Sequence, residues 1–168
     1  ENCPRRYWYA YIGKPEIEKV ESVEAFLGKR VHETMEELYR LKQGGRVLTE
    51  EETVRWFETA WERNWSEDVR VVSRRLAPED YRRVGLDSVA AYHRRHRPFD
   101  QSKTRGLEKR VLLDLDPGGT RKMQGYVDRI ARRSDGTYEI HDYKTSAHLP
   151  TQEQADRDRQ LALYQIGL

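Results

Sequence analysis

The chain has little cysteine, no long apolar run and almost no net charge. Its single cysteine, Cys3, cannot form an internal disulfide and cannot hold a zinc ion or an iron–sulfur cluster alone. No apolar stretch approaches the roughly 20 residues of a membrane-spanning helix, and the first residues lack the apolar core of a signal peptide. We therefore expect a cytoplasmic protein with no membrane partner. A net charge of +2 favours a polyanionic partner only weakly, so the positions of the basic residues matter more than their sum.

The composition indicates a folded domain. Charged residues and hydrophobic residues each make up 36% of the 168 residues, and 4 Trp and 10 Tyr supply large apolar groups, which argues against disorder. We expect one domain over residues 1–168, mainly helical in residues 1–98 and built from strands and a closing helix in residues 99–168.

Helical periodicity dominates the first part. Thr49 and Glu52 have the spacing of a capping box, whereas Gly85 makes the helix that contains it the least certain. Apolar spacing and end signals predict helices at 4–12, from Ser22 to Gly44, from Thr49 through Trp65, and from Pro78 to Pro98.

After Pro98 the apolar pattern changes to the period of a strand. It predicts strands at 107–115, 121–132 and 137–144, with turns at 116–119 and at Asp135-Gly136, and then a helix from about Thr151. Helices that cover a small sheet in this order predict a layered α/β or α+β domain.

Two of these strands carry acidic residues and a lysine. Asp128 ends the tract Gly125-Tyr126-Val127-Asp128, and Asp142 and Lys144 lie in the next strand of the predicted hairpin. Because strand side chains alternate, Asp142 and Lys144 are expected on one face, where carboxylates bind a hard cation beside an ammonium group. A metal-dependent phosphodiesterase needs this arrangement.

The order of motifs resembles the PD-(D/E)XK nuclease superfamily, in particular its RecB-like branch of helicase-linked and CRISPR-adaptation-type nuclease domains. The resemblance spans nearly the whole chain. It rests on five motifs in order: an opening aromatic-basic motif (Cys3–Tyr7), a helical Gly-x-x-x-His motif (Gly28–His32), a Gly-x-x-Asp strand (Gly125–Asp128), an Asp-x-Lys core (Asp142–Lys144) and a Gln-x-x-x-Tyr helix (Gln160–Tyr164).

The resemblance implies a restriction-endonuclease-like mixed β-sheet with flanking helices. Its final strand is expected to be missing from this chain, which would then be a fragment of a longer protein. The implied activity is Mg²⁺- or Mn²⁺-dependent hydrolysis of DNA phosphodiester bonds, by an exonuclease module in recombination, repair or defence, with a helicase domain or subunit as a candidate partner. Single- and double-stranded substrates both stay open. The alternative is a catalytically inactive DNA-binding or scaffolding module with the same fold.

The resemblance also implies roles for individual residues. Asp128, Asp142 and His32 would bind the metal, and Lys144 would orient the attacking water or stabilise negative charge. Gln160 and Tyr164, which share a helix face, would form hydrogen bonds near Lys144 and the scissile phosphate. Taken alone, a histidine among apolar helix residues is more often structural, and Gln160 and Tyr164 would be an ordinary pair at the edge of the core.

Several further residues have two interpretations. Glu108 fits an accessory or second-metal role and equally well a solvated strand face, while Glu139 and His141 are expected to face away from Asp142. DNA contact is expected from basic residues that could also be solvated helix faces, namely Arg5, Arg6, Arg94, Arg95 and Arg97. Tyr7, Trp8 and Tyr11 suit either stacking on a single strand or packing against the core.

Cys3 occupies a position that holds an iron–sulfur cluster in some relatives. Those relatives have three more cysteines after the Gln-x-x-x-Tyr helix, whereas this chain has no second cysteine. We therefore expect no iron–sulfur cluster in this chain.

Overall fold

A computed structural model describes residues 3–13, 15, 20–145 and 151–167. The elements, in chain order, are α1 (Pro4–Tyr7), the π-helical turn η1 (Trp8–Ile12), β1 (Glu21–Ser22), α2 (Val23–Gln43), α3 (Glu50–Asn64), β2 (Val69–Arg70), α4 (Pro78–His96), β3 (Lys103–Asp114), β4 (Lys122–Arg132), β5 (Tyr138–His141), α5 (Gln152–Asp156) and α6 (Arg159–Gly167). Within the described residues, no helix is long and apolar enough to cross a membrane.

Local sequence signals set the starts of the long helices. The Ser22 hydroxyl accepts a hydrogen bond of 3.2 Å from the Ala25 N–H and begins α2. At α3 the predicted capping box forms, because Thr49 Oγ1 accepts from Glu52 N at 3.1 Å while the Glu52 carboxylate accepts from Thr49 N at 2.9 Å. Both predicted helix starts are confirmed.

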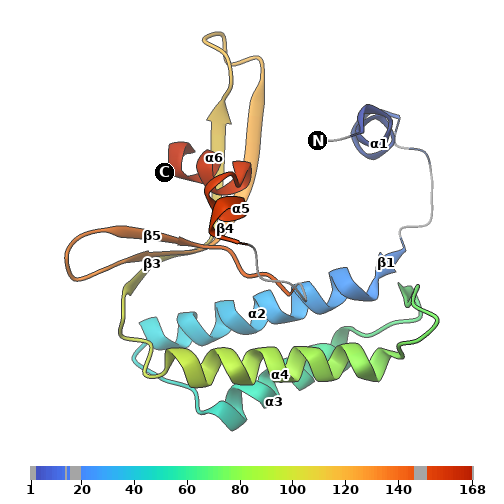
Figure 1. Ribbon diagram of the computed structural model, residues 1–168, viewed down its shortest axis with the longest axis vertical. Helices are drawn as coiled ribbons and strands as arrows, with labels where there is room; N and C mark the ends of the chain where they lie inside the picture. Colours follow the sequence, from blue (N-terminus) through green and yellow to red (C-terminus); the bar gives the residue numbers. More distant parts are fainter. Residues whose placement is uncertain (1–2, 14, 16–19, 146–150, 168) are drawn as a thin grey trace.

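Helices α2, α3 and α4 pack together into one layer (Figure 1). Phe26, Met35, Phe57 and Val89 are almost fully buried in its core. Gly85, which weakened the prediction of α4, permits this contact, because a Cβ atom there would lie 2.1 Å from Phe57 Cζ. The cost of about 1 kcal/mol for glycine in a helix is thus offset by the burial of an aromatic ring.

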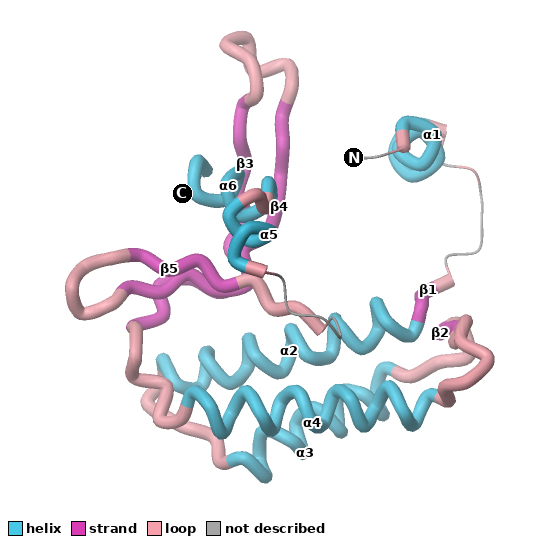
Figure 2. Tube along the Cα trace, in the orientation of Figure 1, coloured by secondary structure: helices cyan, strands magenta, loops and turns pink. Residues whose placement is uncertain are grey.

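The second layer is the antiparallel sheet β3-β4-β5. Its long β3–β4 hairpin bends at Glu108, a non-glycine residue with a φ of +45°. The start of β3 lies along the helices, and the rest of the hairpin rises away from them with α6 beside it (Figures 1 and 2). Leu107 accordingly packs with Leu38, Tyr39 and Phe99 on the helical side, whereas Val111 packs with Tyr164 of α6.

The fold confirms the predicted mixed α/β architecture and corrects three details. Strand β5 ends at His141 and not at Lys144, so Asp142 and Lys144 lie beyond the strand ladder. The predicted closing helix is two helices, and the Asp158 carboxylate accepts from Gln160 N at 2.7 Å where the second one begins. The short parallel pair β1–β2 was not predicted. The expectation that a final strand is missing from this chain stays a prediction.

Candidate active site

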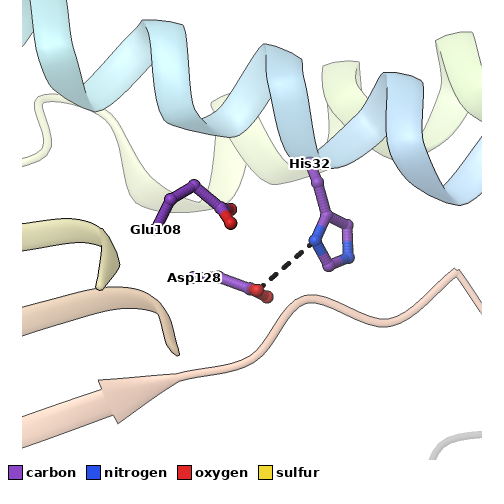
Figure 3. A group of neighbouring side chains, drawn as sticks. All are labelled: His32, Glu108 and Asp128. Carbon is purple, nitrogen blue, oxygen red and sulfur yellow. Dashed lines mark ion pairs between the residues drawn. The ribbon is translucent and has the colours of Figure 1, made fainter. Parts of the chain in front are cut away.

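His32 and Asp128 meet between the middle of α2 and the bend of β4 (Figure 3). His32 Nε2 lies 2.7 Å from the carbonyl oxygen of Tyr143, and His32 Nδ1 lies 3.4 Å from Asp128 Oδ1. A carbonyl oxygen can only accept, so Nε2 carries a hydrogen and Nδ1 of the neutral ring presents its lone pair to the carboxylate. Asp128 Oδ2 accepts from Tyr143 N at 2.6 Å. The backbone of Tyr143 therefore fixes both side chains.

A cation between these two groups would relieve an electrostatic conflict. A lone pair that faces a carboxylate is unfavourable unless a proton or a metal ion lies between them. The hydrogen bond with Asp128 accordingly raises the pKa of His32, against the opposing effect of burial. The Tyr143 carbonyl fixes the tautomer and the ring orientation of His32, as a carbonyl that accepts from the second ring nitrogen does for metal-binding histidines generally.

Glu108 completes a group of three possible ligands. It lies between the cross-strand pairs Leu107–Arg129 and Lys109–Val127, opposite Asp128. Its carboxylate, the Asp128 carboxylate and a ring nitrogen of His32 offer ligand atoms that all lie within 4.8 Å of one another (Figure 3). Burial, followed by the charges of Asp128 and Glu36, raises the pKa of Glu108.

The surroundings of Glu108 could hold a cation. Two carboxylates directly opposite one another on paired strands are destabilising, and a non-glycine residue with positive φ stores backbone strain. Beside the group opens a cleft of ≈ 470 Å³, lined among others by Gly28, His32, Glu36 and Glu108. Oxygen and imidazole ligands facing a solvent-filled cleft suit a hard or borderline divalent cation.

A second polar group lies just beyond β5 and on α6. The Lys144 ammonium group is 2.5 Å from Asp142 Oδ2. Gln160 lies between the charged pair and α6, since it donates to Asp142 Oδ1 at 3.4 Å and to the Tyr164 hydroxyl at 2.8 Å and accepts from Lys144 at 3.4 Å. These predicted site residues are thus brought together.

Tyr164 depends on the glycine of the Gly-x-x-Asp tract. A Cβ atom at Gly125 would lie 2.6 Å from Tyr164 Cε1, so only glycine lets the ring pack on β4. Tyr164 is 6% exposed. The glycine therefore places the Gln160 side chain, through Tyr164, next to Asp142 and Lys144.

Tyr143 joins the two groups. It lies between Asp142 and Lys144, and its backbone N–H and carbonyl contact Asp128 and His32. Among the described residues, the third possible ligand beside His32 and Asp128 is Glu108, whereas the predicted ligand Asp142 forms an ion pair with Lys144. The structure thus places the predicted residues His32 and Asp128 in one group and Asp142, Lys144, Gln160 and Tyr164 in a second group next to it.

Sequence reasoning missed the buried support behind Tyr143. Its ring meets Tyr92 edge-on at 5.6 Å, and the Tyr92 hydroxyl lies 2.7 Å from that of Tyr39. Arg129, which is 3% exposed, places its guanidinium 3.8 Å from the centre of the Tyr39 ring and contacts His141 at 3.1 Å. The one sequence signal was an arginine directly after Asp128 in an otherwise apolar strand segment.

The predicted nucleic-acid contacts are placed less favourably. Arg94 forms an ion pair with Glu50, so its charge is already compensated, while Arg95 and Arg97 are exposed. The Arg5 guanidinium lies 5.8 Å from the ring centre of Tyr9, and the side chain of Arg6 lies outside the description. α1 and η1 lie apart from the three long helices (Figure 1).

Of the two interpretations of Tyr7, Trp8 and Tyr11, the structure does not support packing against the core. Tyr7, Trp8 and Tyr11 are 49%, 48% and 60% exposed. Their rings instead contact neighbours in the same segment, such as the pair Tyr7 and Tyr11 at 4.9 Å.

Comparison with known proteins agrees with this geometry. A family model of the PD-(D/E)XK nuclease superfamily, whose members generally use divalent metals, matches residues 1–168. No curated protein and no solved structure gives a significant match. The match over the full chain shows that this protein belongs to the PD-(D/E)XK nuclease superfamily.

Proposed function

We propose that this protein is a Mg²⁺- or Mn²⁺-dependent deoxyribonuclease. The observation that carries the proposal is the convergence of His32, Glu108 and Asp128 within 4.8 Å, directly beside the pair of Asp142 and Lys144. A bound divalent ion would supply a Lewis acid that neutralises charge on the phosphoryl group and activates water for attack.

The residues of the chain have separate tasks in this proposal. His32, Asp128 and Glu108 would hold the ion, and Asp142, which forms an ion pair with Lys144, is the further ligand expected from the sequence. Lys144 stabilises the negative charge that develops on the phosphoryl group, as a compact ammonium that a guanidinium would not replace equivalently. Gln160 keeps the Lys144 side chain next to Asp142, since it contacts both.

Tyr143 would position the metal ligands through its backbone. Its N–H donates to Asp128 and its carbonyl accepts from His32, while its ring is packed against Tyr92. Because the same residue lies between Asp142 and Lys144, one anchored peptide sets the spacing of all four side chains. Burial raises the pKa of the Tyr143 hydroxyl, so it stays neutral beside the site.

The rival function is a DNA-binding or scaffolding module without activity. Asp128, Asp142 and Lys144 are all present and in contact with partners that orient them, which favours an enzyme. We further propose, from the sequence resemblance, that residues 1–168 are one exonuclease domain in recombination, repair or defence, and that a helicase domain is its candidate partner.

Purified protein incubated with end-labelled linear DNA and with closed circular DNA tests this function. With Mn²⁺ or Mg²⁺ the linear DNA should be degraded and the circle spared, and a chelator should stop the reaction. Cutting of the circle would replace the exonuclease by an endonuclease. DNA binding without cleavage in either metal would support the inactive module.

A further inference from the structure

The rising part of the β3–β4 hairpin has one covered face and one open face. Val111 and Val127 are buried against α6, and Gly125 lies against Tyr164. Alternate residues point the other way, where Leu112 is 51% and Tyr126 is 50% exposed. The open face consists of the cross-strand pairs Arg110–Tyr126, Leu112–Gln124 and Asp114–Lys122.

This face leads directly to the metal ligands. Arg110 and Tyr126 pair across the strands, and each lies two residues from Glu108 or Asp128. Two residues of a strand span about 6.6 Å, so the pair lies about one nucleotide step from the proposed site of cleavage. Arg110 donates a hydrogen bond of 2.9 Å to Gln124, which holds the guanidinium on this face.

The chemistry of the face suits single-stranded nucleic acid. A half-exposed aromatic ring is a platform for stacking an unpaired base, and an exposed guanidinium contacts phosphate. Away from the ends of a duplex both faces of each base are already stacked on neighbouring pairs, so Tyr126 has no base face there to stack on. Asp114 and Lys122 form an ion pair of 2.8 Å, so their charges compensate one another. Arg110 is the charged residue of the open face that lies nearest to the site.

We propose that the open face of the β3–β4 hairpin binds single-stranded DNA next to the metal ligands, with a base stacked on Tyr126 and a phosphate held by Arg110. The inference rests on the proposed nuclease function, because it identifies the substrate as a single strand. An exposed tyrosine on a strand is common in itself. The order of groups along one face points to a track for the strand: first the metal ligands, then the Arg110–Tyr126 pair, then the exposed Leu112.

The other hairpin supplies a matched control. Arg132 and Tyr138 also pair across two strands, with the guanidinium 5.8 Å from the ring centre and Tyr138 62% exposed. Arg132 is the last residue of β4, four residues beyond Asp128, and Tyr138 is the first residue of β5. Tyr138→Ala therefore removes the same chemical group from a similar setting outside the proposed track.

Binding is best measured with the full chain, Ca²⁺ in place of Mn²⁺ to suppress cleavage, and a fluorescent thymidine oligonucleotide. Tyr126→Ala should weaken binding about tenfold, within the 5- to 150-fold range of one lost stacking contact, and Tyr126→Phe and Tyr138→Ala should not. An oligonucleotide of abasic sites should bind wild type and Tyr126→Ala equally. Arg110→Ala should reduce the slope of log affinity against log salt concentration by about the amount that one phosphate contact contributes.

Two outcomes would overturn the track. Equal affinity of wild type and Tyr126→Ala for the thymidine strand would do so, as would an equal loss for Tyr126→Ala and Tyr138→Ala. Cleavage by the same wild-type preparation in Mn²⁺ is recorded separately. If wild type cleaves DNA normally and Tyr126→Ala does not change the affinity, the binding track is refuted and the nuclease function is not. If the affinity depends on Tyr126 but no cleavage occurs, the track is supported and the nuclease function is contradicted.

Discussion

Replacement of Asp128 separates its structural contact from its proposed role as a metal ligand. Its Oδ2 accepts the Tyr143 N–H at 2.6 Å, and its Oδ1 faces His32 Nδ1 at 3.4 Å. Asp128→Asn keeps an oxygen for the N–H but removes the charge that a cation requires. Asp128→Ala removes both and leaves a buried N–H without a partner, which costs about 1–3 kcal/mol.

Thermal unfolding at pH 8, with and without Mn²⁺, gives these effects as numbers. Mn²⁺ at about one hundred times its Kd stabilises a folded protein by about 2.7 kcal/mol. At about 2–4 °C per kcal/mol for a domain of this size, the wild-type Tm should rise by roughly 5–11 °C. Without metal, Asp128→Asn should melt close to wild type and Asp128→Ala roughly 2–12 °C lower. Neither variant should respond to Mn²⁺.

The control is Asp114→Asn, which removes an exposed carboxylate from the tip of the same hairpin and should keep the full response to Mn²⁺. A wild-type response in Asp128→Asn would refute the assignment of Asp128 as a metal ligand. Equal metal-free Tm values for Asp128→Asn and Asp128→Ala would refute the structural role of the Tyr143 hydrogen bond.

Three further predictions follow from the same contacts. Because the pKa values of His32 and Glu108 are raised, the metal-free folded protein holds protons that the unfolded chain has released. The free energy of unfolding should therefore fall as pH rises from 4.5 through 6.5 and above, while the affinity for Mn²⁺ rises. Urea titrations with and without Mn²⁺ across this range measure both trends, and a flat profile contradicts them. Lys144→Arg should slow single-turnover cleavage about 10²–10³-fold with unchanged DNA binding, because the charge is kept but the compact ammonium is lost, and a near-wild-type rate would argue against its role. Gly125→Ala should lower stability by about 1–3 kcal/mol and slow cleavage, because its Cβ would displace Tyr164, and urea denaturation that matches wild type would mean that the ring moves at no cost.

The sequence predicted elements whose signals are local. The Ser22 cap and the Thr49 capping box fixed the starts of α2 and α3, and a change of period marked the passage from helices to strands. The family motifs predicted that the site residues lie on neighbouring elements. Such features depend on residues a few positions apart, so the sequence contains them in full.

Features that depend on contacts between distant residues were not predictable. Strand β5 ends early because the N–H of Tyr143 donates to Asp128 and its carbonyl accepts from His32, so these groups are not available to a strand ladder. The alternation of strand side chains alone did not decide whether Glu108 faces solvent or the site. Its place beside His32 follows from the bend of the hairpin at a positive φ, which no local pattern encodes.

Single-turnover cleavage of linear DNA by Asp142→Ala in Mn²⁺ tests the central claim most directly. Asp142 contacts Lys144 and Gln160 and supports no part of the core, so the variant should fold and bind DNA as the wild type does. We expect wild-type protein to degrade the DNA and Asp142→Ala to leave it intact. Cleavage by Asp142→Ala at the wild-type rate, with a contaminating nuclease excluded, would contradict the account.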